Sequence, residues 1–192
     1  MKSAETLRQP TVLPALRTDA VLIHVALLAL ASFLLPAAAH TLGLPVRQIL
    51  PMHWPVILAG LCYGWRSGAL IGLLAPFASY LISGMPLPHI LPAMTVELAV
   101  YGFVAGFARE YLRWNWFAAA AASLIVGRIF FLAFVLTFRS VPQPFGEYVA
   151  AAMVPGIPAA IAQFLILSAA SWWWLNKRRG GNQRSKSPTV SG

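Results

Sequence analysis

Hydrophobic positions in this chain are gathered into long blocks that short polar segments separate. The apolar stretches cover residues 20–39, 49–65, 68–83, 91–108, 116–138 and 148–175. A helix of about 17–25 apolar residues is long enough to cross the hydrocarbon core of a bilayer. The pattern therefore predicts an all-α membrane protein with six transmembrane helices. The second, third and fourth are at the short end of that range, and proline or glycine bounds each of them.

The flanking segments are polar and define the expected domain organisation. Residues 1–19 form a cytoplasmic N-terminal segment in this interpretation, and residues 20–175 form the six-helix membrane domain. The tail over residues 176–192 is basic and rich in glycine and serine, a composition typical of disorder. We expect this tail to be cytoplasmic as well.

Composition excludes several classes of protein. Hydrophobic residues make up 59% of the 192 residues and charged residues only 10%, and the mean hydropathy is +0.71. A soluble domain of this size has too little interior to bury so much apolar surface, so a soluble enzyme is excluded, and disorder with it. The chain is too short for most transporters built from two large repeats, and it leaves no room for a separate catalytic domain.

The basic residues predict how the chain is oriented in the membrane. The formal net charge is +9, but Lys and Arg lie in short runs between apolar segments, which does not indicate nucleic-acid binding. With both termini in the cytoplasm, eleven basic residues lie inside and two, Arg47 and Arg139, lie outside. This asymmetry favours six spans in the cell membrane with both termini cytoplasmic. The eleven are Lys2, Arg8, Arg17, Arg66, Arg109, Arg113, Lys177, Arg178, Arg179, Arg184 and Lys186.

The first apolar stretch also has a second interpretation. Residues 36–40 read Pro-Ala-Ala-Ala-His, an A-x-A cleavage pattern after an apolar run, as in a signal peptide. The polar segment before that run is about 20 residues long, which is unusual for such a peptide. Cleavage would also leave an odd number of spans.

Two ionisable residues lie inside the predicted spans. Glu97 is about 9 Å from the outer end of the fourth helix, and Arg128 is about 15 Å from the outer end of the fifth. Charged groups at such depths are costly and mark functional sites by default. A long arginine side chain can reach toward the outer face, so the two groups could pair, either as a structural ion pair or against a polar ligand.

Side chains suited to binding an organic molecule gather at the expected outer ends of the helices. Met94, Glu97 and Tyr101 follow i, i+3, i+7 spacing and share one helix face. Three of the four histidines, His40, His53 and His89, lie at the same membrane face. Such histidines can also be interfacial anchors, and their spacing is not that of a zinc site. The candidate substrate-binding residues are His53, Trp54, Tyr80, Met85, His89, Met94, Glu97, Tyr101 and Arg128.

Other features indicate packing. The chain has one cysteine, Cys62, which we interpret as a small buried hydrophobe. Small residues recur four apart, as in Gly68 and Gly72, which lets helix backbones approach closely within the chain or against a partner. Pro155 and Pro158 lie inside the last stretch and should kink it. No catalytic motif is found, so we do not expect an enzyme.

The segment from residue 50 to residue 106 resembles the substrate-binding S components of energy-coupling factor (ECF) vitamin importers. The resemblance rests on the runs PMHWPV at 51–56, LAG at 58–60 and GWRSGALIG at 64–72, and on SGMP at 83–86 and ELAVYG at 97–102. It covers about a third of the chain. It implies a small membrane protein that binds a vitamin at its outer face and carries it inward by toppling in the bilayer.

The resemblance also implies partners and a substrate. Partner ATPases would drive the toppling through a membrane coupling subunit that contacts small residues, for which Ala26, Ala29, Gly68 and Gly72 are the candidates. Family members often carry an A-x-x-x-A stripe in the first helix, whereas Ala26 and Ala29 are three apart. The best expectation for the ligand is cobalamin or a related corrinoid, with His53 or His89 as a candidate cobalt ligand. No intrinsic cofactor is expected.

Three function classes follow from these observations. A binding and transport subunit for a corrinoid or for another vitamin or cofactor precursor is the first. A small membrane enzyme acting on a lipid or cofactor is the second, although it would lack a base–nucleophile pair, and chemistry on a bound corrinoid stays open. A membrane scaffold is the third. A ligand that co-purifies with the chain would separate these classes.

Overall fold

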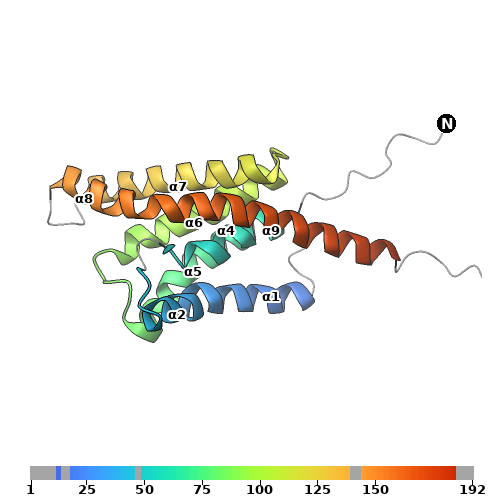
Figure 1. Cartoon of the computed structure of the whole chain (residues 1–192), viewed down its shortest axis with the longest axis horizontal. Coiled ribbons are helices and arrows are strands. Elements are labelled where there is room, and N and C mark those ends of the chain that lie inside the picture. The colour runs from blue at the N-terminus through green and yellow to red at the C-terminus, as the bar shows by residue number, and fades with distance from the viewer. Residues whose placement is uncertain (1–11, 14–17, 46–48, 139–143, 185–192) are drawn as a thin grey trace, which may run out of the picture.

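Helices provide all the regular structure in the computed structural model, which describes residues 12–13, 18–45, 49–138 and 144–184 (Figure 1). The all-α membrane fold expected from the apolar blocks is therefore confirmed. In chain order the elements are α1 (Thr18–Ala29), the π-helical turn η1 (Leu30–Leu34), α2 (Leu35–Thr41), α4 (His53–Tyr63), α5 (Trp65–Ser83), α6 (Leu91–Glu110), α7 (Trp116–Phe138), α8 (Phe145–Met153), the 3₁₀ turn η2 (Val154–Gly156) and α9 (Ile157–Arg184).

Five segments of the described chain are long and apolar enough to cross a bilayer. They are Ala20–Thr41, Trp65–Ser83, Leu91–Glu110, Trp116–Phe138 and Gly146–Lys177. Many of their large apolar side chains are exposed in the isolated chain, for example Leu22 at 68% and Leu81 at 83%. Exposed apolar side chains of this kind suit a lipid surrounding, because lipid tails are as apolar as they are.

The second expected span, residues 49–65, does not form one long helix. Instead α4 has 11 residues, which is about 16 Å at 1.5 Å per residue and well short of a bilayer. Leu50 just before it has a positive φ of 49°, and Gly64 after it has a φ of 90°, so the helix ends on both sides. Nine of its residues are buried. A short helix with irregular backbone at one end is tolerated there because neighbouring helices enclose it.

Prolines shape the first and last membrane segments. Pro36 has no N–H to donate to the carbonyl four residues earlier, and the helix widens to a π turn over Leu30–Leu34, in which the Leu35 N–H bonds the Leu30 carbonyl. The last segment breaks at η2, where Pro155 lies, and Pro158 is the second residue of α9, which follows at once. The kink expected from these two prolines is confirmed.

Helix α6 lies at the centre of the bundle and packs on α4, α5 and α7. Its contact with α5 depends on small residues, because a Cβ on Gly102 would lie 2.1 Å from the Gly68 carbonyl oxygen. On its other side the Ser123 hydroxyl of α7 donates to the Tyr101 carbonyl at 2.7 Å. Close backbone approach is how helices associate in lipid, where no hydrophobic effect drives them together.

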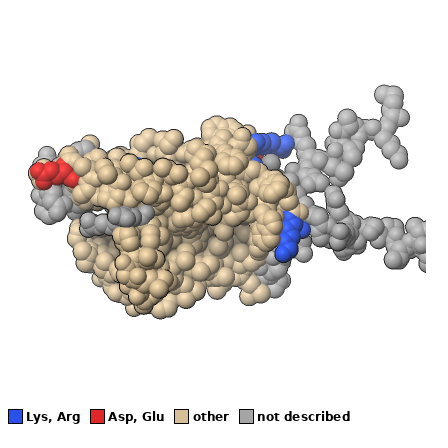
Figure 2. Space-filling view, viewed as in Figure 1, with Lys and Arg blue, Asp and Glu red and all other residues tan. Residues whose placement is uncertain are grey.

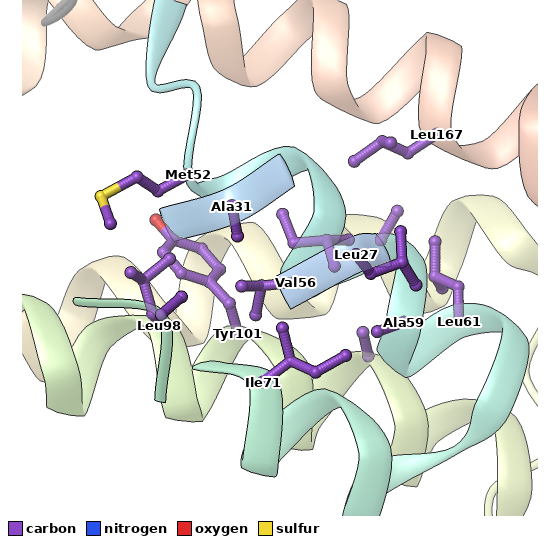
Figure 3. Close-up of a cluster of buried hydrophobic side chains, with 14 of the residues drawn as sticks. Leu27, Ala31, Met52, Val56, Ala59, Leu61, Ile71, Leu98, Tyr101 and Leu167 are labelled. Carbon is purple, nitrogen blue, oxygen red and sulfur yellow. The ribbon is translucent and has the colours of Figure 1, made fainter. Parts of the chain in front are cut away.

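The main core cluster lies where α1, η1, α4, α5, α6, α7 and α9 meet, and Figure 3 shows its labelled side chains converging between these helices. Val56, Leu61 and Leu98 are completely buried there. Leu27 and Ala31 bring the first membrane segment into the same cluster. The core therefore fixes the first segment onto the rest of the bundle.

The two ends of the bundle differ in charge. The first residues of α1 and the last turns of α9 lie at the same end (Figure 1), and the visible Lys and Arg side chains gather there, whereas the visible acidic side chain lies at the opposite end, by α8 (Figure 2). Helix α9 continues to Arg184, beyond the expected boundary at residue 175, since no proline interrupts it before Pro188. Residues 185–192 of the expected tail and residues 1–11 and 14–17 of the N-terminal segment lie outside the described residues.

Candidate functional site

A cavity of about 710 Å³ opens at the end of the bundle opposite the basic one. A volume of about 300–1,000 Å³ is usual for sites that hold a small organic molecule. Its walls come from η1, α2, the segment before α4, the end of α5, the α5–α6 loop, the first half of α6, the middle of α7 and α8. The lining residues are Ser32, Phe33, Pro36, Ala37, His40, Leu50, Pro51, Met52, His53, Ser79, Ser83, Met85, Pro86, Leu87, Ile90, Met94, Glu97, Arg128, Phe131, Glu147, Tyr148 and Ala151.

Glu97 is the charged centre of this cavity. Its side chain is only 2% exposed, and its Oε1 lies 2.9 Å from Nη1 of Arg128. The Tyr101 hydroxyl donates to the same oxygen at 3.2 Å. The pair between α6 and α7, which the depths of Glu97 and Arg128 left open, is therefore present in the structure. A buried carboxylate without such partners would be strongly destabilising, so these contacts explain how the charge is tolerated.

His53 lies beside Glu97 at the start of α4. Its Nε2 is 3.6 Å from Glu97 Oε1, and its ring packs edge-on against the Tyr101 ring at 5.1 Å between centroids. The residue is 2% exposed, and neither ring nitrogen has a hydrogen-bond partner among the described residues. Buried polar groups are normally satisfied, so an unpartnered imidazole on a cavity wall is a candidate ligand contact.

Local backbone geometry brings these groups to one level. The positive φ of Leu50 turns the chain so that α4 begins inside the bundle, with Met52 and His53 at its start. The π turn η1 presents Ser32 and Phe33 to the same cavity from the first membrane segment. The cavity floor is therefore formed by the short helix and its neighbours, roughly where Glu97 lies along α6.

The structure brings together five of the nine candidate substrate-binding residues as cavity lining: His53, Met85, Met94, Glu97 and Arg128. Tyr101 lies behind them and reaches the site through Glu97. His40 from the first outer segment also lines the cavity.

Three candidates lie apart from the cavity lining. Trp54 is turned away, because its indole N–H donates to the Ile49 carbonyl at 2.9 Å and its ring lines a separate apolar groove of about 350 Å³. Tyr80 is half-buried and does not line the cavity, and His89 is exposed beyond it. Helix phase places Tyr80 on another side of α5 from Ser79, which does line the cavity.

Several lining residues were missed by the sequence reasoning. Ser32 and Ser79 look like ordinary small helix residues, and Phe131 and Tyr148 look like membrane aromatics. Glu147 carried a usable signal, since it is an acidic residue next to an expected outer loop. The others depend on how the helices pack, which no local pattern reveals.

The expected docking residues divide into two groups. Gly68 and Gly72 are buried against α6, where a Cβ on Gly72 would lie 2.3 Å from the Leu98 carbonyl oxygen. Their small size is thus already used inside the chain, and a role in partner docking does not fit this placement. Ala26 and Ala29 are exposed on α1, next to Leu22 and Val25.

The described residues contain no group of three or more His, Cys, Asp or Glu side chains placed to hold a metal ion. Cys62 is 1% exposed and lies near the end of α4 away from the cavity, as expected from its position in the sequence. Of the two candidate cobalt ligands, His53 lines the cavity and His89 does not.

Comparison with known proteins points to one family. A family model described as "ECF transporter, substrate-specific component" matches residues 20–171, which includes the helices that form the cavity. No curated protein and no solved structure gives a significant match.

Proposed function

The chain belongs to the family of ECF transporter substrate-specific components, and on this basis we propose that the cavity beside Glu97 is its substrate site. Members of this family bind small substrates and associate with the ATPase and transmembrane components of ECF transporters in the plasma membrane. The observation that carries the proposal is the buried cluster of Glu97, Arg128, His53 and Tyr101 at the floor of a cavity large enough for a small molecule.

The orientation follows from charge. Arg66 lies at the start of α5, Arg109 and Arg113 at the end of α6 and just after it, and Lys177 toward the end of α9. The visible Lys and Arg side chains gather at the end of the bundle away from α8 (Figure 2). Since basic residues favour the cytoplasmic side, we propose that the cavity opens outward and that both termini are cytoplasmic. In this arrangement α4 is the second of six membrane segments, although it does not span the bilayer by itself.

Cavity size supports a substrate smaller than a corrinoid. A volume of about 710 Å³ is in the range for drug-sized ligands, whereas a corrin macrocycle with its nucleotide arm is far larger. His53, the candidate cobalt ligand that lines the cavity, is also held against Glu97 and Tyr101 at the floor. We therefore propose a vitamin or cofactor precursor of modest size in place of the cobalamin expected from the resemblance.

Docking to the transmembrane coupling component is proposed for the exposed face of α1. Ala26 and Ala29 are exposed there, and small residues let a partner helix approach closely. A bulky substitution such as Ala26→Leu should weaken co-purification with a coupling component without changing substrate binding. Unchanged co-purification would place the contact elsewhere on the chain.

The experiment that tests the proposed function is identification of the molecule that the full chain retains in detergent. Molecules are released by heat and identified by mass spectrometry, and their affinity is then measured by calorimetric titration. We expect Glu97→Gln and His53→Ala to weaken binding about tenfold or more, because each removes a polar partner from a buried site.

The matched control is His89→Ala, since His89 is exposed and lies outside the cavity lining. It should bind as well as the unaltered chain. Equal affinity in all four proteins would contradict the assignment of the cavity, and conversion of the retained molecule to a product without partner subunits would favour a membrane enzyme.

A further inference from the structure

The charge of the cavity is opposite to that of the chain. The chain carries a formal net charge of +9, yet the described lining contains two acidic residues, Glu97 and Glu147, and one basic residue, Arg128. The mouth and walls are otherwise formed by apolar, hydroxyl and histidine side chains. The described lining is therefore net negative when its two histidines are neutral.

Arg128 does not make the cavity attractive to an anionic ligand, because its positive charge is already paired with Glu97. Its Nη1 is already 2.9 Å from Glu97, and a Cβ on Gly156 would lie 3.3 Å from its Nη2, so the break before α9 lies close against it. An anionic ligand at this guanidinium would place two negative groups around one positive group in a site of low dielectric constant. The like charges would repel each other strongly there.

The remaining polar groups at the floor suit a hydrogen-bond donor. Glu97 only accepts hydrogen bonds when it is ionised. The two ring nitrogens of His53, at 2% exposure, make no hydrogen bond within the described part of the chain, and the nearer one, Nε2, is 3.6 Å from Glu97 Oε1. A neutral imidazole uses one nitrogen as a donor and the other as an acceptor. A ligand with an N–H or O–H group beside an acceptor atom would satisfy both residues together.

We propose that the cavity takes a compact neutral or singly cationic molecule whose donor edge meets Glu97 and His53, and that it discriminates against carboxylates and phosphates. This inference rests on the proposed function and narrows the class of substrate. Flat apolar parts of such a molecule would contact Met52, Met94 and Phe131 on the walls.

The test compares a cationic and an anionic thiol reagent of similar size. The full chain is prepared with Cys62→Ala, which removes its one cysteine, and with Met94→Cys in the cavity. Trimethylammonium-ethyl and sulfonate-ethyl methanethiosulfonate are applied separately, and each rate is divided by the rate with a free thiol in solution. Because the full chain is used, the measured rates also include any effect of Arg47 and Arg139, which lie outside the described residues.

We expect the normalised rate of the cationic reagent at Met94→Cys to exceed that of the anionic reagent about tenfold or more, as in clefts lined by one sign of charge. Adding Glu97→Gln and Glu147→Gln should abolish the preference. Leu42→Cys, where the native side chain is 71% exposed outside the cavity lining, is the accessibility control. Met85→Cys at the same cavity replaces Met94→Cys if that variant does not fold.

The outcomes separate this inference from the proposed function. Equal rates, or a faster anionic reagent, would overturn the charge selectivity and leave the cavity as a substrate site. A carboxylate or phosphate compound as the retained molecule would have the same consequence. Failure of both reagents at both cavity positions, while Leu42→Cys reacts with both, would show a cavity closed to solvent and would contradict the proposed function as well.

Discussion

The ion pair between Glu97 and Arg128 allows the most direct test of how this bundle holds its buried charges. The two atoms are 2.9 Å apart, and the side chains are 2% and 15% exposed. At an effective dielectric constant of about 20, two unit charges at this distance attract by about 6 kcal/mol before desolvation is subtracted. Removing one partner of a buried pair typically destabilises a protein by about 3–5 kcal/mol.

The two single variants should differ. Arg128→Ala leaves a carboxylate at 2% exposure, and within the described residues the Tyr101 hydroxyl is then its one hydrogen-bond donor, so we expect a loss of about 3–5 kcal/mol. Glu97→Gln leaves an arginine that is partly exposed to the cavity and stays hydrated, so we expect a loss of about 1–3 kcal/mol. The double variant should lose less than Arg128→Ala alone, because it no longer buries an unpaired carboxylate, so the coupling energy should exceed the loss expected for Glu97→Gln by itself.

The assay is unfolding in mixed micelles with increasing dodecyl sulfate, followed by the fluorescence of the seven tryptophans. Glu147→Gln combined with Arg128→Ala is the control cycle, because Glu147 is exposed and no ion pair between these two residues is found among the described contacts. Additive losses at Glu97 and Arg128, within about 0.5 kcal/mol, would refute the reasoning. The geometry would then not reflect an energetic pairing.

Two further variants test the packing that positions the site. Gly102→Ala should destabilise the chain by about 1–3 kcal/mol in the same assay, because its Cβ would lie 2.1 Å from the Gly68 carbonyl oxygen. The control is Gly146→Ala, which has open space around it and should change the free energy of unfolding very little. Equal effects of the two substitutions would contradict the close α5–α6 contact. Arg109→Lys should lower the free energy of unfolding by about 1–2 kcal/mol, since the guanidinium stacks on the Trp116 ring at 3.4 Å and donates to the Trp114 carbonyl. An unchanged midpoint of the dodecyl sulfate unfolding curve would show that neither contact contributes.

Much of the candidate site could be predicted because charge inside an apolar segment is a strong signal. The depths of Glu97 and Arg128 in their helices showed that the two side chains could meet, but they left open whether the residues pair with each other or contact a ligand. The i, i+3, i+7 spacing on α6 correctly placed Met94 and Glu97 on the cavity side, with Tyr101 beneath them. It did not show which histidine would join them, because His53 and His89 both lie at the expected outer ends of the helices and carry the same side chain.

The sequence by itself determined that the chain is a helical membrane protein, because its long apolar blocks fit a bilayer, and it indicated which buried charges need partners. Only the tertiary structure decided that residues 49–65 contain a short enclosed helix, since α4 begins after a positive φ at Leu50, ends at a positive φ at Gly64, and has nine of its residues buried by neighbours. The cavity exists because α4 begins inside the bundle. Its lining is a product of packing between distant segments, and this is why Ser32, Phe131 and Glu147 could be assigned to it only in three dimensions.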